Sequence, residues 1–426
     1  MKKPITVGFG VLGLVAWMVG AALADGVMRD GLGAISSGRG GANIAFADNA
    51  SVLLDNPAGM SAMESCGLIG LGVDLLMTDL NYQDPENSVD AKFHPMPLPE
   101  VALMRRSCDG RWGYGLGVFA PAGFSAEYDM SHPLLGDRLY KSIGGLVKVL
   151  PGLSYRLTDR LAIGATFGVA VSHAEIEGPY FVQTGPFRGA PCVLDLQGTG
   201  AAPVYSLGLQ YQLTERTTMG LAYQSASRFE LHGSASTDIY GLAPLPVSSR
   251  FDAEVDLEWP RSLGLGLKHE LSGDRRLGVD VIWFDWSDAF DSIDMRFADA
   301  TNPLVPAVLG QTVTDSLPLD WEDSISVRIG YEQAISPCAV VRAGYVYHGN
   351  PIPTATLTPY IPAVVEHGVS AGFSRILGQW SVDLAYQYSF GDHQEVALSS
   401  LAGGDFNYSR VEAHAHWLLL GFTRRY

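Results

Sequence analysis

Residues 161–172 read LAIGATFGVAVS and alternate between two kinds of side chain. The odd-numbered positions, from Leu161 to Val171, are apolar, while the even-numbered positions are alanine, glycine, threonine or serine. This period of two predicts a β-strand with one apolar face and one face of small or weakly polar residues. A strand between lipid and a barrel lumen has such faces. A strand of a soluble sandwich alternates similarly, so the spacing of the other strands must decide.

The pattern recurs along the chain after residue 65. We expect fourteen strands, at residues 66–80, 98–107, 111–121, 144–157, 160–174, 202–213, 216–232, 255–271, 275–297, 320–334, 338–349, 366–376, 379–393 and 409–425. Six connections are tight and carry the Gly, Asp, Ser or Pro that turns require, and seven are long; the two kinds alternate strictly. Outer-membrane barrels have even strand numbers, short periplasmic turns and longer outer loops. The sequence therefore predicts an all-β fold, a 14-stranded antiparallel transmembrane β-barrel over residues 66–426.

The composition agrees with a barrel in a bilayer. Charged residues make up 17% of the chain, hydrophobic residues 47%, and there are 49 glycines. A soluble protein carries about 25% charged residues. The formal net charge of −17 argues against nucleic acid as a partner, because no basic patch offsets phosphate repulsion.

The first residues predict export. Lys2 and Lys3 precede an apolar stretch from Ile5 to Leu23, and Ala22-Leu23-Ala24 has the small-x-small form of a cleavage site. This pattern predicts a signal peptide over residues 1–24. A membrane anchor is the alternative, because the apolar run is almost long enough to span a bilayer. The small-residue ending and the lack of a basic flank favour cleavage, and the barrel places the protein in a Gram-negative outer membrane.

Residues 25–65 do not alternate and are rich in glycine and alanine. We expect this segment to form an N-terminal plug inside the lumen, since a fourteen-stranded barrel would otherwise leak. A flexible periplasmic tail is the alternative, but the segment has hydrophobic content and no charge runs.

A set of short motifs carries a family resemblance. Within residues 25–65 they are Gly38-Arg39-Gly40-Gly41-Ala42, Ala47-Asp48-Asn49-Ala50-Ser51 and Asn56-Pro57-Ala58-Gly59-Met60. Further motifs lie at residues 113–121, 151–155, 207–213, 321–323, 342–345 and 351–353. Together they resemble the FadL/TodX family of outer-membrane transporters for long-chain fatty acids and other hydrophobic compounds, over essentially the whole mature chain. The resemblance implies capture by an apolar outer groove, movement of the plug, or hatch, and lateral release without a cofactor.

The resemblance also implies roles for particular residues. The hatch motif is Asn56, Pro57 and Ala58, for which the simpler interpretation is a rigid turn. In the family a kink in the third strand opens the wall, and the matching segment here carries Gly113, Gly115, Gly117 and Pro121. Glycine weakens strand packing and proline cannot donate to a ladder, which suits an opening. Equally, the glycines could only leave room for the plug.

Two predicted outer loops are unusually apolar, and exposed apolar clusters usually mark binding surfaces. Loop 121–143 supplies the expected capture residues Phe124, Tyr128, Met130, Leu134, Leu135 and Leu139. Loop 297–319 adds Phe297, Leu304, Val305, Val308, Leu309 and Leu317. Packing of the loops on themselves is the competing interpretation.

Other functions fit less well. The chain has no H-E-x-x-H motif, and its one G-x-S-x-G match, residues 368–372, lies inside an expected strand and not at the elbow of a strand-to-helix turn. We therefore expect no enzyme and no metal site, although His414 and His416 share a strand face. A general diffusion porin, or a structural or adhesin barrel, is the main alternative. The expected partners are a hydrophobic small molecule, outer-membrane lipid and lipopolysaccharide, with the protein itself monomeric.

Two questions stay open. Cys66 and Cys108 are expected to meet at the periplasmic rim, where a disulfide is plausible. A fatty acid needs a cation for its carboxylate, whereas a hydrocarbon does not. The basic residues that could face the lumen are Arg105, Lys148, Arg156, Arg261 and Arg328.

Overall fold

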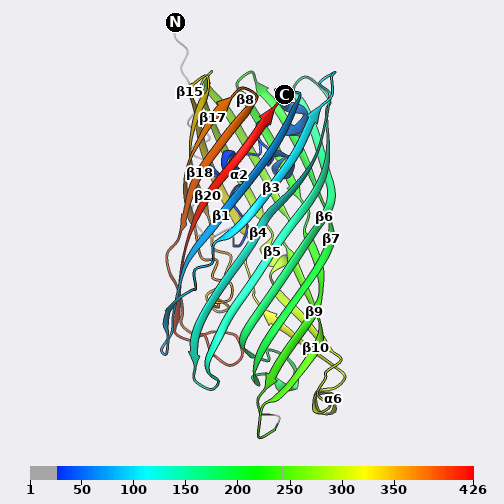
Figure 1. The fold of residues 1–426 in the computed structure, drawn as a ribbon, viewed down its shortest axis with the longest axis vertical. Coiled ribbons are helices and arrows are strands. Elements are labelled where there is room, and N and C mark those ends of the chain that lie inside the picture. The colour runs from blue at the N-terminus through cyan, green and yellow to red at the C-terminus, as the bar shows by residue number, and fades with distance from the viewer. Residues whose placement is uncertain (1–25, 242) are drawn as a thin grey trace.

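The computed structural model describes residues 26–426 except residue 242 (Figure 1). The predicted signal peptide, residues 1–24, lies outside these residues. The predicted fold is confirmed: fourteen antiparallel strands form a closed barrel. These wall strands are β1 (Gly67–Gln83), β3 (Met96–Arg106), β4 (Trp112–His132), β5 (Gly136–Arg156), β6 (Leu161–Phe181), β7 (Pro191–Thr214), β8 (Thr217–Gln224), β11 (Ser262–Ser272), β12 (Arg275–Phe284), β15 (Ser324–Ser336), β16 (Ala339–His348), β17 (His367–Leu377), β18 (Trp380–Phe390) and β20 (Ser409–Arg425), and β20 closes the ring on β1.

Shorter elements extend the wall on the outer side. They are β2 (Ser88–Asp90), β9 (Ser227–Ile239), β10 (Val247–Trp259), β13 (Ser292–Ala298), β14 (Thr312–Pro318) and β19 (Gln394–Val396), with α5 (Trp286–Ala289), α6 (Leu304–Leu309) and the 3-10 turn η1 (Gly185–Phe187). In Figure 1 the short turns and the C-terminus lie at the upper end, and these extensions lie toward the lower end. In the described part of the chain, no helix is long and apolar enough to cross a membrane.

The alternation in β6 places its residues as expected. Ile163, Phe167 and Val169 face outward and are exposed, while Ala162 and Ala170 are buried on the luminal side. The six predicted tight turns all join wall strands at one end. The alternation therefore identifies the two faces of the wall, and the tight turns identify the periplasmic end.

The predicted loop 121–143 is wrong. Its residues continue β4 and β5, which pair as far as His132 and Gly136 and leave only a tight turn between them. Pro121 does not end the strand, because it lies in a β-bulge between Phe119 and Ala122, where no ladder donor is needed. The outer ends of several strands run past their predicted ends in the same way, since the outward face is no longer apolar there.

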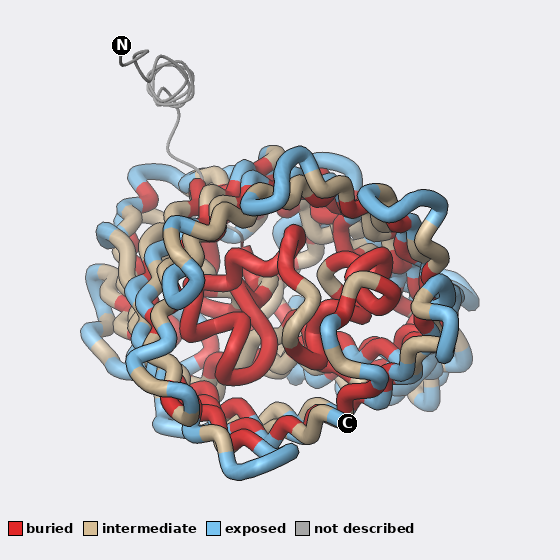
Figure 2. The backbone as a smooth tube through the Cα atoms, turned by 90° about the horizontal axis from the view of Figure 1, so that it is seen from above, coloured by how far each residue is buried: buried red, intermediate tan, exposed pale blue. Residues whose placement is uncertain are grey.

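Residues 26–65 lie inside the barrel, as Figure 2 shows, and we call them the luminal segment. It contains three short helices, α2 (Gly33–Ser37), α3 (Val52–Asp55) and α4 (Gly59–Ala62). Wall glycines face it closely: a Cβ on Gly344 would lie 2.0 Å from the amide nitrogen of Gly40, and one on Gly164 would lie 2.4 Å from Pro57. Much of the glycine content thus lets backbone approach backbone.

Candidate functional site

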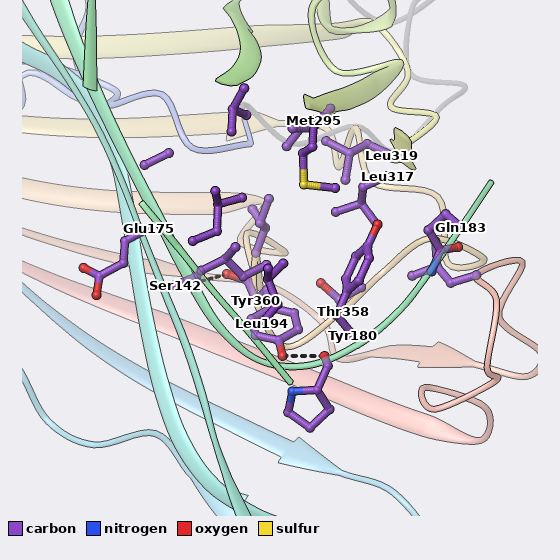
Figure 3. A pocket seen from close by; sticks show the side chains of 18 of the residues that line it. Ser142, Glu175, Tyr180, Gln183, Leu194, Met295, Leu317, Leu319, Thr358 and Tyr360 are labelled. Atoms are coloured by element: carbon purple, nitrogen blue, oxygen red, sulfur yellow. Dashed lines mark hydrogen bonds between the residues drawn. The ribbon is translucent and has the colours of Figure 1, made fainter. Parts of the chain in front are cut away.

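A mostly apolar pocket lies in the outer half of the barrel (Figure 3). It has about 1070 Å³ of empty space, counted to its open mouth. Strands β4, β5, β6, β7, β10, β13 and β14 and the loops 349–366 and 397–408 supply its walls. Five lining side chains are polar, namely Ser142, Glu175, Gln183, Thr358 and Asp405, and the others are aliphatic, aromatic or proline. A large apolar cavity with few polar groups is the usual form of a small-molecule site.

Most of the polar groups at the pocket are bonded to protein partners. The Ser142 hydroxyl donates to the carbonyl of Tyr360, and the Tyr360 hydroxyl donates to the carbonyl of Pro179 at 3.0 Å. The side-chain amide of Gln183 donates to the carbonyl of Phe181 at 2.7 Å. Glu175 turns away from Leu194 and Tyr360 in Figure 3, toward the Lys141 ammonium 2.6 Å away.

Two loops form the roof of the pocket. In loop 349–366, Tyr360 stacks on Tyr140 with ring centroids 5.6 Å apart. In loop 397–408, Asp405 lies 3.0 Å from Nε2 of His132. The other ring nitrogen of His132 accepts two backbone N–H bonds, so Nε2 carries the proton and donates to Asp405. Burial raises the pKa of Asp405, and His132 opposes that shift.

Beneath the pocket the wall is interrupted. Among the described residues, β3 and β4 pair only from Val101–Val118 down to Arg106–Gly113. Residues 26–30, which we call the N-terminal arm, fill the gap between β3 and β4 on the outer side of this pairing. Met28 pairs with Ala122 in an isolated antiparallel bridge.

Charged groups fasten the arm. The N–H of Arg29 donates to the Pro121 carbonyl at 3.0 Å. Its guanidinium forms a buried ion pair with Asp74 of β1 and lies 4.8 Å from the ring centroid of Trp417. Asp30 lies 3.2 Å from the ring nitrogen of His348 on β16, four strands around the ring from β1. Side-chain contacts to β1 and β16 therefore hold the arm.

The rest of the luminal segment is anchored more heavily. Arg39 pairs with Asp48 at 3.0 Å and with Glu332 of β15 at 3.4 Å. Asp280 of β12 accepts the backbone N–H groups of Asn43 and Ile44 at 2.6 and 2.9 Å. Burial raises the pKa of Asp48, but the guanidinium groups of Arg39 and Arg276 outweigh it and hold that pKa well below its ordinary value.

The hatch motif is part of this anchor. Asn56 is fully buried, and its side-chain amide donates to the carbonyls of Ile44 at 2.8 Å and Leu209 at 3.1 Å. Its oxygen accepts the N–H of Ala58 at 3.2 Å, while Pro57 lies against Gly164. These contacts describe a rigid turn docked on β6 and β7, and a gating role stays a prediction.

The predicted opening residues divide into two groups. A Cβ on Gly113 would lie 2.6 Å from the backbone of Met60, and one on Gly117 would lie 3.0 Å from a methyl group of Leu53. Gly115 likewise faces Met60, so the three glycines leave room for the luminal segment. Only Pro121 lies at the interruption itself.

The predicted capture residues are also separated. Phe124 lines the pocket, whereas Tyr128, Met130 and Leu135 are buried elsewhere in the outer barrel. Leu134 is exposed at the hairpin turn, and Leu139 is half-buried. From the second predicted loop, Leu317 lines the pocket, Phe297 and Val305 are buried, Leu304 and Val308 are exposed, and Leu309 is half-buried.

Cys66 and Cys108 are both free and exposed thiols in the structure, so their pairing stays a prediction for the oxidised protein. Of the basic residues, Arg328 and Arg156 donate to carbonyls of the luminal segment. Arg105 and Arg261 are exposed. Lys148 is buried on β5 and does not line the pocket.

Sequence reasoning missed several site residues. Arg29 and Asp74 fasten the arm, and Trp286, Phe290 and Trp321 form an aromatic cluster below the pocket. Asp74 gave a signal, because an acid within the apolar run of residues 68–77 has to face the lumen. The aromatic cluster gave none, since its members are distant in sequence.

The comparisons with known proteins agree with this geometry. Residues 15–426 match the family model described as "Outer membrane protein transport protein (OMPP1/FadL/TodX)". Among curated proteins, a search with this chain finds no match.

Similar solved structures include a Pseudomonas aeruginosa FadL homologue, with a TM-score of 0.74 and 18% identity over 94% of this chain and 99% of that one. The P. putida toluene transporter TodX has a TM-score of 0.77 and 20% identity, covering 93% and 99% of the two chains. The Ralstonia pickettii toluene transporter TbuX has a TM-score of 0.72 and 19% identity, again covering 93% and 99%. At these identities the likeness shows a shared fold.

Proposed function

Because the chain belongs to the OMPP1/FadL/TodX family of outer membrane transport proteins, we propose that it admits uncharged hydrophobic molecules through the outer membrane. The molecule enters the outer pocket, the N-terminal arm moves, and the molecule leaves sideways through the interruption between β3 and β4. No cofactor or energy source takes part, since movement follows the concentration gradient.

The observation that carries the proposal is the lack of a cationic side chain among the residues that line the pocket. A carboxylate in an apolar site needs a cation or several free donors. Here the hydroxyls of Ser142 and Tyr360 and the amide of Gln183 already donate to backbone carbonyls. At the margin, Lys141 is already paired with Glu175, and Asp405 would repel an anion.

Neither lysine of β5, Lys141 or Lys148, is among the residues that line the pocket. Lys148 is six positions along β5 from Ser142, which at the rise of a strand is about 20 Å. Toluene and similar hydrocarbons therefore fit this pocket better than ionised fatty acids. The named solved relatives include two toluene transporters, which agrees with this choice.

The luminal segment argues against the porin alternative. It packs against wall glycines around the ring, forms a buried ion pair with Glu332 of β15, and donates backbone hydrogen bonds to Asp280 of β12. A general porin keeps an aqueous channel instead. We also propose that the protein acts as a monomer among lipid and lipopolysaccharide, since each barrel holds its own pocket and break.

The test is to measure the binding of toluene and of laurate to the purified barrel by calorimetry at pH 8. Leu196→Trp fills the pocket from β7, and Leu207→Trp on the exposed face of the same strand is the matched control. We expect saturable toluene binding that Leu196→Trp abolishes and Leu207→Trp retains. Tighter binding of laurate than of toluene, or equal binding by both variants, would contradict the proposal.

A further inference from the structure

The aromatic cluster below the pocket touches both the solute site and the N-terminal arm. Phe290 lines the pocket. Its ring lies edge-on to Trp286 and Trp321, with centroids 4.9 and 4.7 Å away, and the two indoles are 4.8 Å apart. All three side chains are buried, so the cluster is a solid contact between the pocket and whatever lies on its other side.

The first described residue of the arm lies on that other side. A Cβ on Gly26 would be 2.6 Å from ring atom Cζ3 of Trp321 and 3.0 Å from Cζ2 of Trp286. Gly26 also has φ of +61°, which other residues rarely adopt. The backbone of the arm therefore rests directly on the two indoles, and only glycine fits there.

Backbone bonds join the main chains of the three residues. The N–H of Trp321 donates to the carbonyl of Phe290 at 3.0 Å, and the N–H of Phe290 donates to the carbonyl of Trp286 at 2.8 Å. The buried indole N–H of Trp286 has no acceptor among the described residues, so no directional bond fixes that ring. Packing alone holds it, and packed groups shift as a unit.

We propose that Trp286 and Trp321 are positioning residues that couple occupancy of the pocket to displacement of the arm. A solute that presses on Phe290 shifts the two indoles, and the indoles shift Gly26. The next residues of the arm include Met28, whose bridge to Ala122 fills the wall break. This inference rests on the proposed function, because it needs a solute in the pocket.

A disulfide across the bridge reports the position of the arm. In a variant whose four natural cysteines are serine, Met28→Cys and Ala122→Cys place two thiols on directly paired residues, a spacing that a disulfide accepts. The rate of cross-linking by a mild oxidant is measured with and without toluene, beside calorimetric toluene binding. We expect toluene to slow cross-linking by at least about fivefold, the lower end of typical coupling between sites.

Trp286→Leu and Trp321→Leu then test the cluster itself. Neither indole lines the pocket, so both variants should bind toluene while their cross-linking no longer responds to it. Trp321→Phe should restore part of the response, and Trp380→Leu at the exposed rim should leave it intact.

The two proposals fail separately. If the cysteine pair binds no toluene, the proposed function fails. If it binds toluene and the cross-linking rate is unchanged, or if both leucine variants respond like the parent, the coupling inference is wrong.

Discussion

The luminal segment is held in two different ways along its length. Residues 38–60 lie against wall glycines and carry the ion pairs of Arg39 and the bonds of Asn56. The N-terminal arm has one backbone bridge, the ion pair of Arg29 and a small set of side-chain bonds to Asp30. Close backbone packing leaves no alternative position for the first region, whereas the second can detach by losing a few bonds. On the proposed function, this difference would let the barrel stay closed to water while its wall opens.

The largest effect should come from the anchored region. Gly344→Leu places a side chain where the amide of Gly40 lies, so the luminal segment cannot dock. We expect single-channel conductance in planar bilayers to rise roughly tenfold, because a barrel of this size without its filling has a water-filled lumen. Gly145→Leu is the control, since its Cβ would meet nothing within 4 Å. Equal conductance of the two variants would mean that the anchor does not close the lumen.

The next effect should come from the arm. Asp74→Ala leaves the buried guanidinium of Arg29 without its partner, at a cost of about 3–5 kcal/mol. We expect the arm to detach. The cysteine pair Met28→Cys and Ala122→Cys, introduced into the Asp74→Ala protein, should then cross-link more slowly, while conductance stays low. Replacing Arg29 by alanine as well should recover part of the rate. A rise in conductance as large as that of Gly344→Leu would remove the distinction between the two regions.

A smaller effect should come from the pocket. Met295→Lys introduces a cation into the lining of the pocket, which has no lysine or arginine side chain among the described residues. We expect toluene binding to weaken by about tenfold, or 1.4 kcal/mol, and laurate binding to appear at pH 8. Thr314→Lys on the exposed face of β14 is the control. Unchanged preference in Met295→Lys would show that charge at the pocket does not select the solute.

The smallest effect should come from pH. Arg39 and Arg276 lower the pKa of Asp48 in the folded protein. In the unfolded chain the pKa of an aspartate side chain is about 3.9. The stabilisation is therefore complete above the unfolded value and is lost only as pH falls through the lowered one. The change in conductance that Asp48→Asn causes should therefore be the same at pH 8 and at pH 5. Opening within that range would place the closing contact on another titrating group.

The sequence predicted the wall well where lipid imposes a pattern. The alternation in residues 161–172 placed the faces of β6, and the tight turns placed the periplasmic end. The outer boundaries failed because strands beyond the lipid have no apolar face to mark them. Pro121 also misled, since a bulge accepts the proline that a regular ladder would not.

The site was predicted less well. Phe124 was expected in the binding region and lines the pocket, but Tyr128 and Met130 were placed in a loop that is really strand. The pocket joins residues from nine segments, from Phe124 to Phe406, and no local pattern records such a meeting. The position of Gly26 on two tryptophans was equally invisible, because it depends on where the arm ends in space.

The height of the pocket follows from the outward face of β7. Between residues 201 and 213 the outward side chains are apolar, such as Leu207 and Leu213. Asp195, Gln197 and Thr199 also face outward, closer to the outer end of the strand. Leu194 and Leu196 line the pocket behind that polar stretch. On the proposed function, the solute would be received outside the hydrocarbon layer, at the level of the lipopolysaccharide sugars.

The break in the wall between β3 and β4 lies closer to the periplasmic end than the pocket does. On β4 the outward residues up to Val118 are apolar, and Ser125, Glu127 and Asp129 follow beyond the break. The proposed exit would thus lie at the outer boundary of the hydrocarbon, in the outer leaflet. A hydrophobic molecule released there would bypass the sugar layer, and ordinary lateral diffusion in lipid would complete its passage.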